Sequence, residues 1–501
     1  MTRTTPDDLR QAHRTGRPIL LTGGTIVTMD PDLGLLDRGD LLIRGDVVAA
    51  VGTDLRSGAA TGTDLRPGAA VGTDLRPGAA VGTDLWSGAT TGGARPGAAT
   101  EGALVVDVTG DIVAPGFVDT HRHAWQGQLR RITPDVDDLG AYLGTTLAGY
   151  APAYTPEDMY VGTRLAALTA LDCGITCLLD FSHNSRSAAH SDGAVQALLD
   201  TGIRGVHAAM GPHFGEWDRQ WPADLARLVD RYGDHPLLTV RLAALATDEI
   251  AGPDLAYRPE LARLAGELGI GVSVDAVFGA TSSAAILGWA RDNLLGPDVT
   301  LIHCTGLTGA AWRAMADTGT TVSLAPTSEP QLGLENAVPA VDEALAVGIR
   351  PGLSIDVEVA LASDMVTQMR ALYAIQRMRA VEAGYGSGPA RPRLRAADVL
   401  DFATRQGART NGLGDVTGSL TPGRQADLLV VGADELNTMP LNDPVGTLVL
   451  GSDARNVTAV FVAGQVRKWD GRVLDVDLDR LRADVHRSRD RILRAAAQPA
   501  G

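Results

Sequence analysis

The chain has 501 residues, a net charge of −16, and a composition that is 45% hydrophobic and 21% charged. Its length predicts two or three domains, and its acidic balance argues against nucleic acid or an anionic membrane surface as a partner. No apolar run approaches the ~18 residues of a membrane span, no hydrophobic signal segment follows Met1, and three cysteines, an odd count, fit a reducing compartment. We therefore expect a cytoplasmic protein.

The chain up to residue 113 predicts short strands and one unusual insertion. Residues 1–17 are polar and show no periodicity, so we expect a loose N-terminus. Short β-branched runs bounded by Gly and Asp follow from residue 18 to residue 51, which is typical of hairpins. Residues 52–91 contain four ten-residue units that begin with GTDL. Each unit offers a single leucine, too little apolar area to order it, so we favour a weakly ordered loop insertion over a solenoid.

The stretch from Ile112 to Arg131 carries the strongest chemical signal in the sequence. An apolar, strand-like run ends there with His121 and His123. Residues two apart in a strand point to the same face, so both imidazoles are directed into one space, as two ligands of a single metal ion must be. Imidazole suits zinc, iron and nickel. Trp125 and Gln126 follow directly and are candidates to line the mouth of a pocket.

Strand-like and helix-like stretches alternate between residues 113 and 406. Eight of these stretches read as strands, which predicts a (β/α)8 barrel of the α/β class. Active sites of such barrels lie at the carboxyl ends of the strands. Polar side chains stand at the ends of several predicted strands, namely His121, His123, Asp180, Ser182, His183, Asp275, His303 and Asp356.

The last residues of the chain, 473–501, predict a C-terminal helix and a tail. One stripe of a helix over 478–496 is apolar and consists of Leu478, Leu481, Val485 and Ile492. The opposite stripe is basic, with Arg480, Arg487, Arg491 and Arg494, and we interpret it as a face in contact with water.

Two stretches resemble the amidohydrolase superfamily, in particular its branch of chlorohydrolases, guanine deaminases and cytosine deaminases. Residues 115–123, P-G-F-V-D-T-H-R-H, are similar to the signature of the first barrel strand, and residues 402–431 to the return of the chain after the barrel. The resemblance implies a metal-dependent barrel over 114–413, flanked by a small β-sandwich built from 18–113 and 414–472. It also implies a small-molecule substrate and a homo-oligomer, a dimer or larger.

The family's mononuclear site uses the H-x-H pair, a histidine after strand 5, a histidine after strand 6 and an aspartate after strand 8. The resemblance maps the last two onto His303 in L-I-H-C-T-G-L-T and Asp356 in G-L-S-I-D. It implies one divalent metal ion, zinc before iron, that lowers the pKa of a bound water toward ~7. It also implies that Asp356 binds the ion and carries the proton while His303 polarises the substrate. The family's binuclear arrangement needs a barrel lysine, and the only lysine, Lys468, lies beyond the barrel.

The fifth predicted strand departs from the family pattern. In V-S-V-D-A-V-F, residues 272–278, Asp275 stands where the family has a histidine and Phe278 where deaminases carry a glutamate that acts as acid or base. Because a carboxylate can bind zinc at a similar distance, either Asp275 or His303 is expected to complete the ligand set. The loss of the glutamate weakens an assignment as an ordinary deaminase.

Candidate substrate-binding residues follow three of the predicted strands. The segment after strand 7, S-L-A-P-T-S-E-P-Q-L-G, corresponds to a family segment near the substrate. The full set is Trp125, Gln126, Ser182, His183, Glu329 and Gln331. His207, in an apolar strand, is better explained as a core residue than as a ligand.

The leading hypothesis is a metal-dependent hydrolase that cleaves a C–N bond other than a peptide bond, by deamination or by hydrolysis of a cyclic amide or amidine. A lyase, decarboxylase or cyclase is the alternative, because such an enzyme needs the metal as a Lewis acid but not the full set that activates water. A metal-free pseudoenzyme is the third hypothesis, and the joint presence of His121, His123, His303 and Asp356 argues against it.

Overall fold

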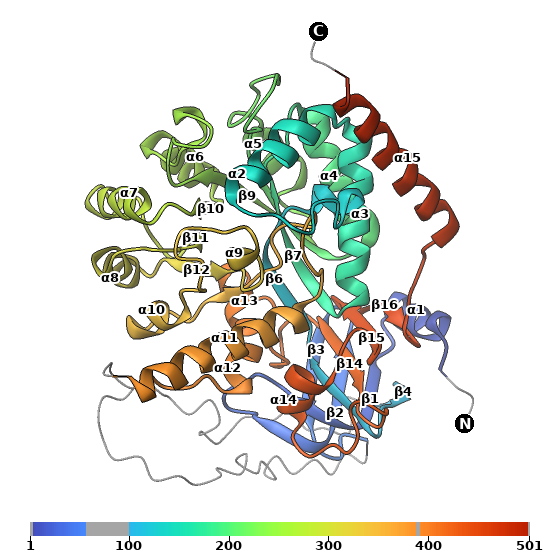
Figure 1. The fold of residues 1–501 in the computed structure, drawn as a ribbon. Coiled ribbons are helices and arrows are strands. Elements are labelled where there is room, and N and C mark those ends of the chain that lie inside the picture. The colour runs from blue at the N-terminus through green and yellow to red at the C-terminus, as the bar shows by residue number, and fades with distance from the viewer. Residues whose placement is uncertain (1–3, 57–99, 387–390, 499–501) are drawn as a thin grey trace. The chain divides into compact units, whose positions relative to one another are not determined.

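The computed structural model describes residues 4–56, 100–386 and 391–498 (Figure 1). They divide into two compact units. The sheet unit comprises Met1–Phe117, Asp172–Thr176 and Leu413–Leu474, and the barrel unit comprises Val118–Leu171, Cys177–Gly412 and Asp475–Gly501. From residue 57 onward, the predicted repeat insertion at 52–91 lies outside the described residues.

Eight parallel strands form the centre of the barrel unit and pair in chain order. They are β6 (Phe117–Arg122), β7 (Ile175–Ser182), β8 (Arg204–Ala209), β9 (Leu238–Leu245), β10 (Gly271–Ala276), β11 (Val299–His303), β12 (Thr321–Leu324) and β13 (Gly352–Leu353). The ring closes beside β6, where the N–H of Asp356 donates to the carbonyl of His121 at 2.9 Å and the N–H of His123 donates to the carbonyl of Asp356 at 3.1 Å. The predicted (β/α)8 barrel is therefore confirmed.

Helices surround these strands, as Figure 1 shows. The main ones are α3 (Pro156–Asp172), α4 (Ala188–Thr201), α5 (Asp224–Tyr232), α6 (Pro259–Leu268), α7 (Gly279–Arg291), α8 (Gly309–Thr318), α10 (Val341–Ala346), α11 (Met365–Tyr385), α12 (Ala396–Phe402) and α13 (Arg405–Thr410). Short elements follow β6, namely η2 (Ala124–Leu129), α2 (Leu139–Tyr142), η3 (Leu143–Tyr150) and η4 (Ala151–Ala153). Within the described ranges, every helix is too short or too polar to cross a lipid bilayer.

The sheet unit is assembled from both ends of the chain, as predicted. Its sheet runs β17-β16-β15-β14-β5-β1-β2-β3, with β4 paired to β1. Strands β5 and β14 join the two halves antiparallel, with Val113 opposite Val430. Leu41 from one half and Phe461 from the other belong to the same buried cluster, so the sheet bends over one shared core. The strands are β1 (Ile19–Val27), β2 (Leu35–Arg44), β3 (Val47–Gly52), β4 (Leu104–Asp107), β5 (Asp111–Pro115), β14 (Leu428–Gly432), β15 (Val457–Val462), β16 (Gln465–Trp469) and β17 (Arg472–Val473).

The prediction of a loose N-terminus over 1–17 is wrong for the described part of that segment. Residues Pro6–Thr15 form helix α1. The Thr5 hydroxyl accepts the N–H of Asp8 at 3.2 Å, and the Asp8 carboxylate accepts the N–H of Thr5 at 2.9 Å, which is a capping box. Leu9, completely buried in the core of the sheet unit, holds the helix in place. The capping residues were visible in the sequence, but the apolar stripe is too narrow to show as a periodicity.

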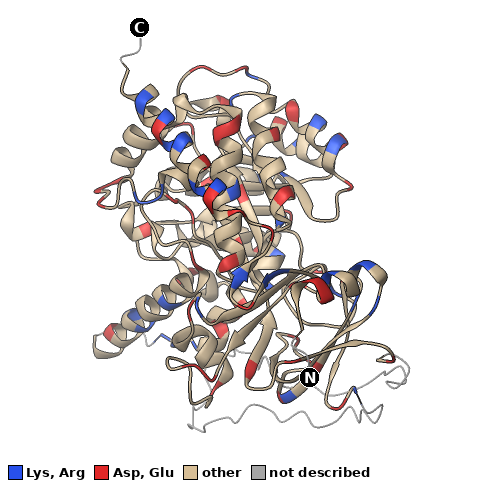
Figure 2. Ribbon diagram, turned by 90° about the vertical axis from the view of Figure 1, so that its right-hand side faces the viewer, with Lys and Arg blue, Asp and Glu red and all other residues tan. Residues whose placement is uncertain are grey.

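Helix α15 (Leu478–Ala496) packs against the short elements that follow β6. Acidic and basic residues are interspersed over the outer helices in Figure 2. The interpretation of all four α15 arginines as a face in water is wrong for Arg491, which pairs with the buried Asp158 and donates to the carbonyl of Ala153 at 2.8 Å. Asp158 also accepts the hydroxyl of Ser488 at 2.6 Å, so this helix is tied to the barrel unit by polar contacts.

Candidate metal centre

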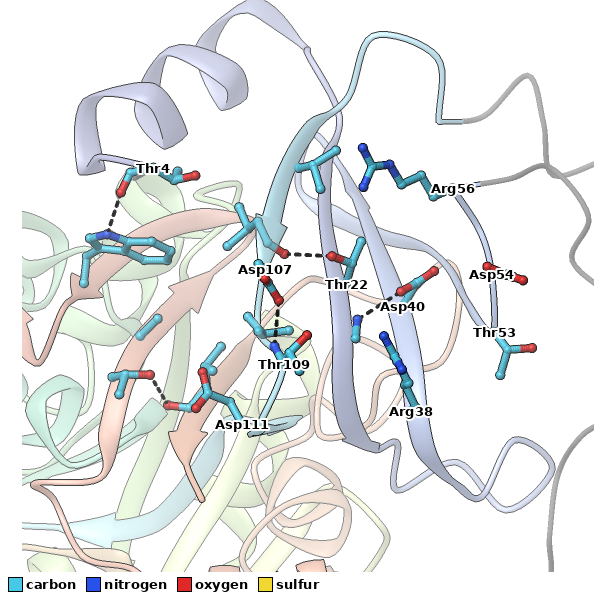
Figure 3. A pocket seen from close by; sticks show the side chains of 18 of the residues that line it. Thr4, Thr22, Arg38, Asp40, Thr53, Asp54, Arg56, Asp107, Thr109 and Asp111 are labelled. Atoms are coloured by element: carbon cyan, nitrogen blue, oxygen red, sulfur yellow. Dashed lines mark hydrogen bonds between the residues drawn. The ribbon is translucent and has the colours of Figure 1, made fainter. Parts of the chain in front are cut away.

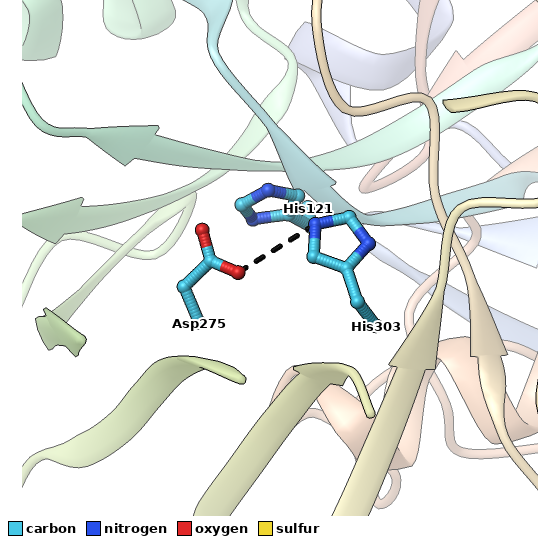
Figure 4. A group of neighbouring side chains, drawn as sticks. All are labelled: His121, Asp275 and His303. Carbon is cyan, nitrogen blue, oxygen red and sulfur yellow. Dashed lines mark ion pairs between the residues drawn. The ribbon is translucent and has the colours of Figure 1, made fainter. Parts of the chain in front are cut away.

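Five side chains with metal-binding atoms meet at the carboxyl ends of the barrel strands. His121 lies near the end of β6 and His123 just beyond it, Asp275 lies in β10, His303 ends β11, and Asp356 follows β13. Two sets of donor atoms each lie within 4.8 Å of one another. One set, drawn in Figure 4, is His121, Asp275 and His303, and the other is His121, His123 and Asp356. The two sets share His121, so the five residues form one cluster.

The spacing of the donor atoms fits a single ion. Oδ1 of Asp356 lies 3.2 Å from Nε2 of His121 and 3.2 Å from Nε2 of His123. Nε2 of His303 lies 3.6 Å from Oδ1 of Asp275 and 3.6 Å from Oδ2 of Asp356. Two ligand atoms bound to one ion at ~2.1 Å stand about 3.0–3.6 Å apart when the bond angle is between about 90° and 120°. The neighbouring donors in the cluster have these separations.

Two of these residues carry buried polar atoms that make no well-aligned hydrogen bond within the described part of the chain. His121 is completely buried, and neither ring nitrogen makes a well-aligned hydrogen bond. Oδ1 of Asp275 is buried and makes none. Buried polar atoms are almost always satisfied, so unsatisfied donor atoms in one cluster fit a cation that both would bind.

The outer ring nitrogens of two histidines are held by the protein. Nδ1 of His123 lies 3.0 Å from the carbonyl oxygen of Phe181, and Nδ1 of His303 lies 3.4 Å from Oε1 of Glu329. An N–H at Nδ1 can donate to each of these oxygens, which leaves the Nε2 lone pairs directed at the centre of the cluster. His303 and Asp356 have φ values of 65° and 70°, a left-handed backbone region that non-glycine residues uncommonly occupy.

The charges of the cluster influence one another strongly. Burial opposes ionisation of Asp356, but the contacts with His121 and His123 outweigh it and hold the pKa of that carboxyl well below its usual range. Burial also opposes protonation of His303, yet the nearby carboxylates, Glu329 foremost, raise its pKa to about 9. Burial raises the pKa of Glu329 itself. Asp356 is therefore the carboxylate of this group that is most firmly held in its ionised form.

A buried ionic network lies behind the cluster and connects β6 to the segment that carries Asp356. Arg122, between the two histidines of the H-x-H pair, is completely buried. Its Nε donates to Oδ2 of Asp119 at 2.6 Å, and its Nη1 donates to Oε1 of Glu358 at 3.0 Å. Arg130 donates to the same Glu358 carboxylate at 2.6 Å. Because Glu358 lies two residues after Asp356, the network holds that aspartate against β6.

Trp125 and Gln126, predicted to line the pocket, are both completely buried. Nε1 of Trp125 donates to Nδ1 of His183 at 3.1 Å. The Gln126 carboxamide accepts the N–H of Glu358 at 3.1 Å and donates to the hydroxyl of Tyr142 at 2.8 Å. The polar atoms of both residues are thus committed to protein groups that themselves lie near the cluster.

Ser182, His183 and Glu329 lie where the sequence predicted them. The ring of His183 stacks on His123 with 3.9 Å between centroids, and burial with its histidine neighbours holds the pKa of His183 well below its usual value. Oγ of Ser182 is buried without a hydrogen bond to any described residue. Glu329 is completely buried and accepts the N–H of Ala325 at 2.9 Å. His183 and Glu329 thus contact residues of the cluster, His123 and His303 respectively.

The structure does not bring Gln331 into the cluster. Helix α9 (Ser328–Gln331) is one turn long and buries Ser328 and Glu329, but it leaves Gln331 half-buried on another side, where its side chain donates to the carbonyl of Pro134. His207, predicted as a core residue, is completely buried and pairs with Asp180 at 3.2 Å.

Sequence reasoning missed two residues of this site. Tyr142, at the end of α2, is 4% exposed and binds Gln126, and nothing in its local sequence points to the cluster. Glu358 is completely buried between two arginines. Its position in D-V-E, two residues after Asp356, was the only available signal.

A separate cavity of about 1070 Å³ lies in the sheet unit (Figure 3). Its lining includes Thr22, Arg38, Asp40, Asp107 and Asp111. Burial and the neighbouring acidic groups raise the pKa of Asp111 to about 6. None of the five cluster residues lines this cavity, so we assign it no part in the chemistry of the barrel.

Comparison with known proteins gives matches to one family. Residues 266–467 match the family model described as Amidohydrolase family. The chain is 30% identical over 403 residues to the 8-oxoguanine deaminase of Pseudomonas aeruginosa, which covers 74% of this chain and 85% of that protein. It is 25% identical over 482 residues to a 5-methylthioadenosine/S-adenosylhomocysteine deaminase of Pelotomaculum thermopropionicum, with 94% and 97% covered.

Solved structures show the same fold. An adenosine deaminase from Xanthomonas campestris with bound zinc has a TM-score of 0.75 at 22% identity and covers 95% of this chain and 98% of its own. Atrazine chlorohydrolase TrzN from Arthrobacter aurescens, complexed with zinc, has a TM-score of 0.71 at 21% identity, with 94% and 100% covered.

Proposed function

The chain belongs to the amidohydrolase family and is a hydrolase of C–N bonds other than peptide bonds, and we propose that it deaminates a flat, amino-substituted heterocycle with the help of one divalent metal ion. The observation that carries this proposal is the cluster of His121, His123, Asp275, His303 and Asp356, whose donor atoms have the mutual spacing of ligands to one ion. Two of the relatives, both named deaminases, support the reaction type.

We propose that His121, His123, Oδ1 of Asp356 and Asp275 hold the ion, which leaves His303 to face the substrate. Zinc is the first candidate, as in the zinc-bound structures of similar fold, and iron is the second. When bound, the ion would supply Lewis-acid activation of water at neutral pH. The expected homo-oligomeric state and cytoplasmic location stay predictions.

The two carboxylate oxygens of Asp356 have different roles in this proposal. Oδ1 of Asp356 faces the two histidines of the H-x-H pair, whereas Oδ2 accepts the hydroxyl of Ser328 and faces His303. Oδ2 is therefore the atom that would take a proton from water and pass it to the leaving nitrogen. Phe278, in place of the family's glutamate, cannot do this, so Asp356 carries the proton transfer in our proposal.

The surroundings favour an apolar, planar substrate. A hydrophobic cluster at the same end of the barrel contains Trp125 after β6, Val277 after β10 and Val357 after β13, and Phe278 packs against it. Ligand pockets that are mainly apolar with a few placed polar groups suit flat heterocycles. A highly charged substrate would lack partners there.

The test is ammonia release from 8-oxoguanine, 5-methylthioadenosine and S-adenosylhomocysteine, together with elemental analysis of the purified protein. We expect about one metal ion per chain, loss of that ion in the His121→Ala/His123→Ala variant, and ammonia from at least one of the three compounds. A protein that binds no metal even after reconstitution would contradict the proposal. Turnover without ammonia would instead favour a lyase or a ring-opening hydrolase.

Asp275 provides a separate prediction about the ion. Oxygen ligands suit manganese and iron, whereas imidazole suits zinc. We expect Asp275→His to raise the affinity for zinc relative to manganese about tenfold, or about 1.4 kcal/mol, as measured by competition with a chromophoric chelator. Asp248→His, at an exposed aspartate of the same unit, is the matched control. An unchanged ratio would mean that Asp275 is no ligand and that His303 completes the set.

A further inference from the structure

Tyr142 places a phenol hydroxyl 2.8 Å from the side chain of Gln126, three residues after His123. It is the last residue of α2 and is 4% exposed. Burial raises the pKa of Tyr142 well above its usual value, and the carboxylates of Asp356 and Asp275 add to the effect, so the hydroxyl lies in the field of the cluster and keeps its proton. No motif pointed to this residue, and its neighbours determine what it can do.

The direction of the hydrogen bonds around Tyr142 follows from the chemistry of the partners. A backbone N–H can only donate, so the Gln126 atom that faces the N–H of Glu358 at 3.1 Å is the carboxamide oxygen. The carboxamide nitrogen therefore faces Tyr142 at 2.8 Å, and it too can only donate. The Tyr142 oxygen accepts this bond, and its own proton is not used by Gln126.

Among the described residues that proton meets no acceptor, since the Tyr142 hydroxyl forms its hydrogen bond there with Gln126, which donates. A buried hydroxyl whose proton is free costs stability unless a ligand accepts it. Tyr142 belongs to the same hydrophobic cluster as Trp125, Val277 and Val357, which follow the strands that carry the metal-binding residues. A substrate that contacts those residues would therefore lie near Tyr142, which belongs to the same cluster.

We propose that Tyr142 donates a hydrogen bond to an acceptor on the heterocycle, a ring nitrogen or a ring carbonyl oxygen beside the carbon that is attacked. This inference rests on the proposed function. Negative charge develops on such an acceptor when water adds to the ring, so the bond strengthens in the transition state. Gln126, predicted to contact the substrate, acts instead as a positioning residue that turns the Tyr142 proton toward it.

Two substitutions test the donor and its direction separately. Tyr142→Phe removes the proton with little change of shape. Gln126→Glu replaces the donating nitrogen with an oxygen that accepts the Tyr142 proton and so turns it away from the substrate. We expect each change to lower kcat/KM for the deaminated compound about 100-fold. The double variant is expected to lose no more than either single one, because the donor is already absent. Tyr232→Phe, at the last residue of helix α5, is the control.

Metal content should match the unaltered protein in all variants, and the melting temperature should match in Tyr142→Phe, which separates this role from a structural one. Gln126→Glu buries an added carboxyl group, so its melting temperature is expected to fall. Losses that multiply in the double variant, or a Tyr142→Phe enzyme as active as the Tyr232→Phe control, would overturn the inference. Neutron diffraction from deuterium-exchanged crystals of the full chain tests it without a substrate. The deuteron on the Tyr142 oxygen is expected to point away from Gln126, and a deuteron shared with Gln126 overturns the inference even if the proposed function holds. If no compound is deaminated but the deuteron points away from Gln126, the proposed function fails while the assigned direction stands.

Discussion

Replacing Asp356 by asparagine is expected to lower kcat by at least about 10⁴-fold, because one side chain both binds the ion and moves the proton. Asparagine has the same shape, so the contacts with Ser328 and the β6 backbone can be kept. It cannot accept a proton at neutral pH, and its amide is a weaker ligand than a carboxylate. Single-turnover ammonia release and elemental analysis of the variant measure the two losses separately.

The matched control for this change is Asp317→Asn, the same substitution at an exposed position of helix α8. It should retain full activity and metal content. If Asp356→Asn kept more than about a tenth of the activity, Asp356 could not be the proton carrier that hydrolysis needs. Such a result would favour the alternative of a lyase that uses the metal only as a Lewis acid.

The barrel and the centre of the site could be predicted because both depend on local geometry. Strand alternation alone directs His121 and His123 to one side, and the ends of parallel strands meet at one edge of a barrel. The structure brings Asp275, His303 and Asp356 to the same place. The order of the strands predicts that these residues stand at one edge of the barrel, whereas their roles as metal ligands were predicted from the resemblance to the amidohydrolase superfamily.

The remaining features depend on contacts that no local pattern encodes. Arg122 and Glu358 pair across 236 residues of chain, and only the closed barrel makes them neighbours. Tyr142 lies outside the strands, in a short helix whose place depends on packing. Gln331 was assigned because its segment resembles a family segment near the substrate, but two helical residues, about 200°, separate its direction from that of Glu329. Side-chain direction in short irregular segments follows from tertiary packing.

The second large effect is expected at Glu358. Glu358→Gln should lower the free energy of unfolding at pH 7 by about 3–5 kcal/mol, because it leaves buried cations without their partner. Arg122 would lose the Glu358 carboxylate and keep its contact with Asp119, and burial raises the pKa of the Asp119 carboxyl to about 6, so Asp119 compensates poorly for the loss. Denaturant unfolding of the full chain measures the change. Glu382→Gln, at an exposed position of helix α11, should stay within about 0.5 kcal/mol.

The same carboxylate predicts how stability depends on pH. Burial opposes its ionisation, but Arg130 and Arg122 outweigh burial and lower the pKa of Glu358 from 4.5 to about 2. Its ionised form therefore contributes stability that is fully present above about pH 4.5 and is lost as the pH falls toward about 2, on the order of 3 kcal/mol in total. The Glu358→Gln variant should lack this part of the acid sensitivity. Equal losses between pH 5 and pH 3 in both proteins would show that the network does not hold β6 against the segment of Asp356.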